Sequence, residues 1–338
     1  MGVPAQDADE PTRRKRGFAT WFFAIVGGLV ALGLIASGFY VWRVWSTVNE
    51  FERSDTLLPT ASGRPPAEAS AAGSLNFVLM GSDARSDDEQ GRSDVLMLAH
   101  VPPARDHVYL VSFPRDMWVD VPGRGYAKIN AAYAWGGDQL VISTLESMLD
   151  VRADHAVKID FDGFIGLTTA LGGVTLDNRV ASSAERGRYW WPRGEITIQG
   201  EEALRYVRQR KELPGGDLDR AERQRAVAKA ILVKAMSADV LANPLAFNDF
   251  MGKVGRYVTL DSGLTNDALF SIATSMRLTS SADIRILQAP LGGFSTSSDG
   301  QAIDLVNEEQ LGELAQAIRA GSMGDYYDRY KNQPFAGR

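Results

Sequence analysis

The sequence predicts a layered α/β domain attached to a membrane at its N-terminal end. Short, apolar, β-branched segments follow one another at 75–80, 95–101 and 108–113, and amphipathic helical segments come after them. One long, uncharged, apolar stretch precedes them all. Because the first two strand segments are almost continuously apolar, we expect their sheet to be covered by helices on both faces.

Composition excludes several classes of function. The chain has 338 residues, 45% hydrophobic and 23% charged, as in ordinary globular proteins. A net charge of −6 argues against a nucleic-acid binder. The absence of cysteine removes thiolate catalysis, disulfides and thiolate zinc sites. The three histidines, His100, His107 and His155, lack HxxxH or HExxH spacing, and no GxSxG turn is present, so zinc hydrolases and Ser-His-Asp hydrolases are disfavoured.

Residues 18–42 carry no charge and are long enough to cross the roughly 30 Å hydrocarbon core of a bilayer. The basic cluster at 13–16 precedes them, which favours a cytoplasmic N-terminus. We therefore expect a cytoplasmic tail at 1–17, a single transmembrane helix at 18–42 and an extracytoplasmic proline-rich linker at 43–73. A cleaved signal peptide is the alternative, but the apolar stretch is long for one.

The folded domain is expected at 74–320, followed by a flexible tail at 321–338. Further strands are expected at 157–161, 174–176 and 284–287. Helices are expected from Asp138 through Met148, at 162–171, at 265–276 and at 307–318. Asp219 and Glu222 have the spacing of a capping box, which predicts a long helix from there to about Met236. The helices after Ser237 are amphipathic and follow no linker, so they should complete the same domain.

Charged residues recur two positions apart: Asp83 with Arg85, Arg92 with Asp94, and Arg208 with Arg210. That spacing places both side chains on one face of an extended segment and on nearly opposite faces of a helix. If the three early strands are consecutive antiparallel neighbours, then Asp83, Asp94 and Arg115 meet at one edge of the sheet. Scattered surface charges are the simpler alternative.

A second basic group follows further along the chain. If Arg208 and Arg210 contact one ligand, the helix that begins near Gln199 has to end around Tyr206. Arg220, Arg223 and Gln224 are spaced to share one helical face, in the first turns of a helix whose N-terminus favours anions. The planar guanidinium group suits phosphate oxygens, so these arginines indicate phosphoryl chemistry. A solvated basic helix that pairs with its own carboxylates is an open alternative.

The motifs GSDAR, GRSD, FPRD, KINAAYAWGG, LGGV, YVRQR and GGDLDRAERQ follow one another in this order. This ordered set, over residues 75–236, resembles the LytR-CpsA-Psr family of cell-wall assembly enzymes. The resemblance implies an α/β/α sandwich with a central mixed sheet. It also implies an extracytoplasmic phosphotransferase that moves a glycopolymer from a polyprenyl-pyrophosphate carrier to peptidoglycan, with an apolar pocket for the lipid.

By matching position, the resemblance assigns Asp83 and Asp94 to Mg²⁺ and to the catalytic carboxylates. It assigns the other site residues to the pyrophosphate: Arg85, Arg92, Arg115, Arg208, Arg210, Arg220, Arg223 and Gln224, with Arg208 and Arg210 also counted as catalytic. Either aspartate could take the proton of the acceptor hydroxyl. Magnesium bound through one or two carboxylates and phosphate oxygens agrees with this assignment.

Several points stay open at this level. A non-catalytic binder of the lipid carrier and a polyprenyl-pyrophosphate hydrolase would carry similar motifs. The sequence leaves three polymers open, a teichoic acid, an arabinogalactan or a capsule, because variable loops would meet the sugars. This region includes Trp190, Trp191 and Arg193, whose aromatic rings could stack on sugars or pack within the protein. Apolar residues proposed as possible lining of the lipid pocket are Val141, Leu145, Phe161, Phe164, Ile165 and Val227, although most of them should be ordinary core.

Overall fold

The computed structural model describes residues 51–60, 63–67, 70–82, 93–237, 252 and 254–333. All of them belong to one compact unit, Thr47–Arg338. The expected tail at 1–17 and transmembrane helix at 18–42 lie outside the described residues. Within the described part of the chain, no helix has both the length and the apolarity that a bilayer crossing needs.

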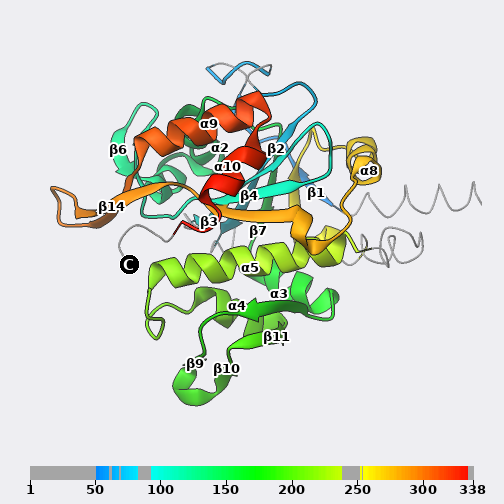
Figure 1. Ribbon diagram of the computed structural model, residues 1–338, viewed down its shortest axis with the longest axis vertical. Coiled ribbons are helices and arrows are strands. Elements are labelled where there is room, and N and C mark those ends of the chain that lie inside the picture. The colour runs from blue at the N-terminus through cyan, green and yellow to red at the C-terminus, as the bar shows by residue number, and fades with distance from the viewer. Residues whose placement is uncertain are drawn as a thin grey trace, which may run out of the picture. The chain divides into compact units, whose positions relative to one another are not determined.

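The domain is an α/β fold built on a mixed sheet of seven strands in the order β1-β12-β7-β2-β3-β4-β13 (Figure 1). These strands are β1 Glu52–Ser54, β12 Thr259–Asp261, β7 His155–Ile159, β2 Leu75–Ser82, β3 Ser93–Val101, β4 Val108–Ser112 and β13 Ile284–Gln288. Four two-stranded sheets are formed by β5 Trp118–Val121 with β6 Gly125–Lys128, β8 Val174–Asn178 with β11 Gly194–Ile198, β9 Ser182–Ala184 with β10 Tyr189–Trp191, and β14 Leu291–Thr296 with β15 Ala302–Val306.

Helices cover both faces of the large sheet (Figure 1). On one side are α2 Ile129–Leu149, α9 Glu308–Ala320 and α10 Met323–Tyr330; on the other are α3 Phe161–Ala170, α4 Gly200–Arg208 and α5 Asp217–Ala235. The other helices in the described part of the chain are α8 Asn266–Ser275 and the short η3 Glu185–Gly187, η4 Gly255–Tyr257 and η5 Ser281–Asp283. Every residue of β4 is buried, as expected for a strand covered on both faces.

The central strands follow the expected connectivity. β2 pairs antiparallel with β3, and β3 pairs antiparallel with β4. The end of β2, the start of β3 and the end of β4 therefore share one edge of the sheet, which confirms the predicted connectivity of these strands. The segments after Ser237 contribute β12 and β13 to the same sheet, so they complete this domain as expected.

The structure corrects the expected limits of the folded domain. The linker expected at 43–73 is in part folded, because β1 pairs with β12 and Leu57 is buried in the core. The tail expected at 321–338 contains α10, in which Met323 and Tyr326 pack into the same core. Both segments are short and polar at many positions, so their composition did not reveal that a few apolar residues anchor them.

Two helix starts also differ from expectation. α5 begins at Asp217 and has Gly216 as its N-cap, without a side-chain cap. Asp219 does not form the expected capping box; its carboxylate accepts a hydrogen bond from the backbone N–H of Gly215 at 2.7 Å. α2 begins nine residues before the expected start at Asp138, since Ile129 is its first residue, and non-helical backbone angles at Gly136 and Gly137 break it in the middle.

Candidate active site

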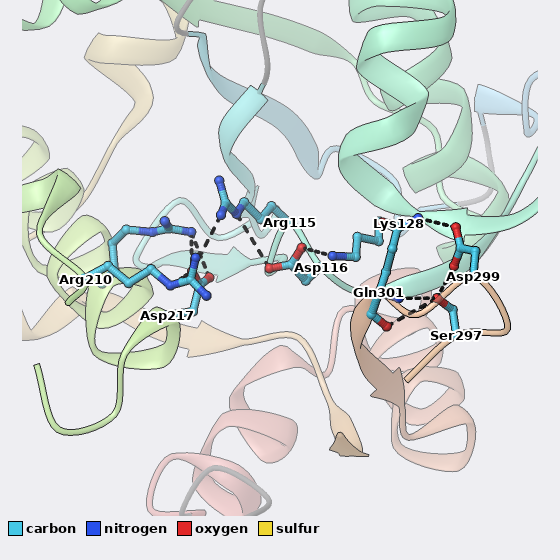
Figure 2. Close-up of polar contacts among 9 residues, drawn as sticks. Arg115, Asp116, Lys128, Arg210, Asp217, Ser297, Asp299 and Gln301 are labelled. Carbon is cyan, nitrogen blue, oxygen red and sulfur yellow. Dashed lines mark hydrogen bonds and ion pairs between the residues drawn. The ribbon is translucent and has the colours of Figure 1, made fainter. Parts of the chain in front are cut away.

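Three of the arginines predicted to bind phosphate converge on one carboxylate, that of Asp217 (Figure 2). Its Oδ1 lies 2.7 Å from Arg220 Nη2, 3.4 Å from Arg210 Nε and 4.0 Å from Arg115 Nη2. The three guanidinium groups come from different elements: α5, the loop after α4 and the loop after β4. Segments about 100 residues apart in the sequence thus contribute cations to one place.

Local backbone geometry explains how Arg210 reaches this place. α4 ends at Arg208, and Gln209 has an extended backbone, so Arg210 lies beyond the helix. A tight turn then leads into α5, where Gly216 has a φ of 54° that L side chains rarely adopt. The turn reverses the chain within a few residues, and it places Arg210 beside the first residue of α5.

Asp116 and Lys128 extend the charged group on its other side. Lys128 Nζ lies 2.8 Å from Asp116 Oδ1, and Arg115 Nε lies 3.6 Å from Asp116 Oδ2. Asp116 follows Arg115 directly, and Lys128 ends β6 just before α2 begins. Positive and negative side chains therefore alternate from Arg210 to Lys128 along this edge of the domain (Figure 2).

A third carboxylate reaches the same region from the C-terminal part of the chain. The backbone N–H of Asp304, on β15, donates to the carbonyl oxygen of Asp116 at 2.9 Å. Burial, and then the negative charges of Asp116 and Asp217, raise the pKa of Asp304 to about 6. Asp304 therefore lies close enough to Asp116 and Asp217 to interact electrostatically with both carboxylates.

A small recess lies between the arginines and the start of β3. Its lining includes Val95, Arg115, Asp217, Arg220 and Gln224. The β2–β3 register passes from Gly81 with Val95 to Ser82 with Ser93, so Asp94 is the extra residue of a bulge. A Cβ on Gly81 would lie 3.0 Å from the Cβ of Val95, which explains why glycine stands there.

Asp83, Arg85 and Arg92 lie outside the described residues, and of Asp94 only the backbone is described. Position 83 directly follows Ser82, the last residue of β2, and Ser82 pairs with Ser93. Of the two aspartates, the structure therefore places only the backbone of Asp94, at one end of the β2–β3 pair. Among the described side chains no group of three or more His, Asp or Glu residues is suited to a metal. Carboxylates together with phosphate oxygens are the ligands that Mg²⁺ prefers, so Mg²⁺ binding by Asp83 and Asp94 stays a prediction.

The remaining predicted residues differ in where they lie. Arg208 is exposed and stacks on Phe161, with its guanidinium carbon 4.4 Å from the ring centroid. Gln224 lines the recess and donates from Nε2 to the carbonyl oxygen of Val207 at 3.3 Å. Arg208 is therefore near the end of α4, and its contact with a phosphate stays a prediction.

Arg223 lies apart from this group and is bound within the protein. It donates to Gln209 Oε1 at 2.6 Å, to Ser182 Oγ at 2.6 Å and to the carbonyl oxygen of Val180 at 3.1 Å. Its guanidinium carbon also lies 4.1 Å from the ring centroid of Tyr206. Burial is the main cause that lowers the pKa of Arg223. This geometry favours a structural role, in which Arg223 ties β9 to the α4–α5 connection.

A partly buried set of polar contacts supports the end of β2 from the other side. Tyr133 Oη and Ser82 Oγ are 3.1 Å apart, and Lys158 Nζ lies 3.1 Å from Asp138 Oδ2. Lys158 also lies 5.7 Å from the centroid of the Tyr133 ring. The two glycines that break α2 separate Tyr133 from Asp138, so both halves of the helix contribute to these contacts.

Sequence reasoning missed three carboxylates of this site. Asp217 had a detectable signal, since it precedes Arg220 by three residues, which is a spacing that allows an ion pair on a helix. Asp116 adjoins Arg115, but adjacency alone does not predict a shared site. Asp304 is nearly 200 residues from Arg115 in the sequence, and no local pattern signals its position.

The apolar residues considered for the lipid pocket are mostly core. Val141, Leu145 and Val227 are each about 1% exposed and pack within the hydrophobic core. Phe161, Phe164 and Ile165 are partly buried against the core under α3 and α4. In contrast, three apolar side chains of the central strand β2 are only half-buried, although helices cover that face: Leu75, Phe77 and Leu79.

The fold and this edge together define an α/β domain suited to a phosphate-bearing anion, because arginines from three elements gather around the carboxylate of Asp217. The chain belongs to the LytR-CpsA-Psr family, whose LytR_cpsA_psr description matches residues 47–320. This confirms the resemblance that the motifs indicated.

Curated relatives are similar over most of their length. The chain is 30% identical over 313 residues to the polyisoprenyl-teichoic acid–peptidoglycan teichoic acid transferase TagU of Bacillus subtilis (strain 168), which covers 92% of this chain and 98% of that protein. It is 32% identical over 308 residues to the TagU of Enterococcus faecalis (strain ATCC 700802 / V583), which covers 88% and 96%.

Solved structures share the fold. The structure of TagT bound to LI-WTA aligns with a TM-score of 0.59 at 27% identity and covers 81% of this chain and 99% of that chain. The crystal structure of Bacillus subtilis TagV aligns with a TM-score of 0.64 at 24% identity and covers 75% and 98%. At that lower identity TagV supports the fold alone.

Proposed function

We propose that this protein is an extracytoplasmic phosphotransferase that attaches a glycopolymer from a polyprenyl-pyrophosphate carrier to peptidoglycan through a phosphodiester bond. The observation that carries the proposal is the convergence of Arg115, Arg210 and Arg220 on Asp217 beside the β2–β3 strand end. A diphosphate bound here would replace part of the charge that Asp217 now supplies. Because three guanidinium groups surround one carboxylate, the arrangement is suited to a ligand with several negative oxygens.

The names of the relatives support the same reaction class. They specify a polyisoprenyl-linked teichoic acid as donor and peptidoglycan as acceptor. Among the polymers that the sequence left open, these names favour a teichoic acid. The match covers 98% and 96% of the two relatives, so it includes nearly all of their length.

The transfer follows from simple chemistry. A hydroxyl oxygen of the acceptor attacks the phosphorus next to the polymer, and the bond from that phosphorus to the carrier's phosphate breaks. Polyprenyl phosphate leaves, and the hydroxyl proton passes to Asp83 or Asp94. The transition state needs positioning and neutralisation of charge more than covalent chemistry, so Arg115, Arg210 and Arg220 would contribute most by holding the phosphate oxygens.

We propose Mg²⁺ as the cofactor, held by Asp83 and Asp94. When bound, it would neutralise negative charge on the phosphate oxygens. The bulge at Asp94 supports this placement, since bulges are common beside active sites.

The carrier lipid needs an apolar surface. The half-buried Leu75, Phe77 and Leu79 of β2 face the layer that contains α5, where Leu232 and Val233 belong to the same apolar cluster. We propose that the polyprenyl chain packs between β2 and α5, with its diphosphate at the strand end. The membrane helix proposed at 18–42 would keep the domain outside the cytoplasmic membrane, next to its lipid-linked donor.

A reconstituted reaction tests the proposed function. The full-length chain in detergent micelles would be incubated with Mg²⁺, a lipid-linked saccharide and peptidoglycan fragments, and the products separated by mass spectrometry. The proposal predicts a saccharide–peptidoglycan conjugate joined by one phosphate. Free saccharide phosphate would indicate a hydrolase, and bound but unchanged donor would indicate a binder; either result would overturn the proposal.

A further inference from the structure

The β14–β15 hairpin is an element of the site that the motifs do not include. It lies beside the charged group because Asp304 bonds to the backbone of Asp116, and because Met117 forms a parallel bridge with Asp304. The turn of the hairpin is closed by polar contacts among Ser297, Asp299 and Gln301, which Figure 2 shows. The hairpin is therefore a defined structure attached to the site, and not a loose loop.

A bulge in this hairpin determines which residue of β14 pairs with Asp304 across the two strands. The register passes from Leu291 with Val306 to Gly293 with Leu305, so Gly292 is an extra residue. As a result Phe294 pairs with Asp304, whereas an unbroken register would pair Gly293 with it. Gly293 has a φ of 146°, which only glycine adopts readily.

Directly paired residues on antiparallel strands project from the same face of the sheet. Phe294 therefore projects from the same face of the hairpin as Asp304. Asp304 interacts electrostatically with Asp116 and Asp217. Phe294 is 50% exposed, so much of its ring is open to a ligand. Leu305, the next residue after Asp304, projects from the opposite face and is 38% exposed.

An exposed aromatic ring next to a carboxylate has the chemistry that recognises sugars: the ring packs on the C–H face of a pyranose, and the carboxylate accepts hydrogen bonds from its hydroxyl groups. The hairpin joins the charged group at Asp116, and Figure 2 shows it on the side of that residue opposite Arg210. A sugar held by the hairpin would therefore approach the phosphate from the side away from Arg210, as an acceptor would.

We propose that Phe294 and Asp304 form the subsite for the acceptor sugar, with Phe294 stacked on a hexopyranose of peptidoglycan and Asp304 bonded to one of its hydroxyl groups. This inference rests on the proposed function and names the element that receives its acceptor. It places the sugar within reach of the phosphate that Arg115 and Arg210 would hold.

The first test measures transfer by the full-length protein as a function of acceptor concentration, with muramidase-digested peptidoglycan as acceptor. Phe294→Ala should raise the acceptor KM about tenfold, which corresponds to about 1.4 kcal/mol of binding free energy. Its donor KM should stay unchanged. Phe294→Tyr, which keeps the ring, should behave like the wild type, and Asp304→Asn should also raise the acceptor KM. Leu305→Ala is the matched control on the opposite face of the same hairpin and should change neither constant.

An acceptor KM in Phe294→Ala that equals that of Leu305→Ala would overturn the inference. A raised donor KM with an unchanged acceptor KM would also overturn it, because the subsite would then belong to the donor.

A second measurement separates this inference from the proposed function. The same peptidoglycan fragments would be titrated against the full-length protein without donor, and binding followed by ligand-observed NMR. Wild type should bind the fragments and Phe294→Ala should bind them about tenfold more weakly. If the wild type bound them in this way but formed no conjugate, the proposed function would fail while the subsite would stand. Equal binding by the two proteins would reject the subsite whatever the transfer assay showed.

Discussion

Asp217 and Arg220 form an ion pair of 2.7 Å within the first turn of α5, and the same carboxylate also faces Arg115 and Arg210. Asp217 is therefore the shared counter-charge of three cations that come from separate elements. Its position at a helix N-terminus is favourable for a carboxylate. The carboxylate of Asp217 holds the three guanidinium groups in place. It also neutralises part of their positive charge, which would otherwise make them repel one another.

Replacing Asp217 should affect turnover more than binding. In Asp217→Asn the three guanidinium groups lose their shared counter-charge and their fixed positions, but they stay available to an anion. We expect kcat for transfer to fall about 100-fold, with a smaller change in pyrophosphate affinity. Steady-state transfer kinetics and displacement of a fluorescent isoprenyl pyrophosphate measure the two effects. Asp120→Asn, at an exposed position of β5, is the control and should resemble the wild type. If Asp217→Asn kept the wild-type kcat, the arginines would not need the Asp217 carboxylate in order to act in transfer.

Arg223 should contribute to stability and not to phosphate binding. Arg223→Ala removes its hydrogen bonds to Gln209, to Ser182 and to the carbonyl oxygen of Val180, so the free energy of unfolding should fall by about 3 kcal/mol. Arg205, on the neighbouring helix α4, forms a more exposed ion pair with Glu185. Arg205→Ala should therefore lower the free energy of unfolding by less than about 1 kcal/mol. Thermal unfolding of both variants checks this. An Arg223→Ala protein that melts like the wild type but no longer binds isoprenyl pyrophosphate would assign Arg223 to the ligand instead.

The strands that position the site could be predicted because their signals are local. β2, β3 and β4 are short apolar runs joined by short connections, so pattern and connectivity together brought Asp94 and Arg115 to one edge. β1 gave no such signal: it has three residues, and its partner β12 lies about 200 residues further on. Asp304 likewise depends on pairing with a remote segment.

The error at α10 has a different cause. Its sequence, MGDYYDRY, is polar enough to resemble a solvent-exposed tail, but Met323 and Tyr326 lie three residues apart and share one buried face. A helix of eight residues offers too little periodicity to identify that face from sequence. The capping box at Asp219 failed because the glycine turn before Asp217 already set the start of α5.

His100 should make the domain less stable in acid. Burial, and then the charge of Arg105, lower the pKa of His100 to about 4. Between pH 6.5 and about 4 the unfolded chain binds a proton at this imidazole and the folded chain does not, so the free energy of unfolding falls as the pH falls, by on the order of 3 kcal/mol.

Two measurements check the effect of His100. NMR titration of the three histidines should show one imidazole with a midpoint near 4. Chemical unfolding between pH 7 and pH 4 should show a weaker pH dependence for His100→Gln than for the control His107→Gln. Three imidazoles that all titrate near their ordinary pKa would contradict the assignment.

Removal of divalent metal should stop transfer. If Asp83 and Asp94 hold Mg²⁺ beside the phosphates, dialysis against EDTA should reduce the transfer rate at least about 100-fold, and added Mg²⁺ should restore it. Asp94→Asn should raise the Mg²⁺ concentration needed for half-maximal rate, because it removes one of the two anionic ligands. Assays over a range of Mg²⁺ concentrations measure both effects. Full transfer in excess EDTA would exclude this role of the aspartates.

The central claim is that acidic and guanidinium side chains at this edge of the sheet act together on one diphosphate. The most direct test is transfer of a lipid-linked saccharide to peptidoglycan by Asp83→Ala and by Arg208→Ala, with the melting temperature of each variant measured in parallel. The account predicts that neither variant forms conjugate and that both unfold at the wild-type temperature. Wild-type turnover by either variant would contradict it.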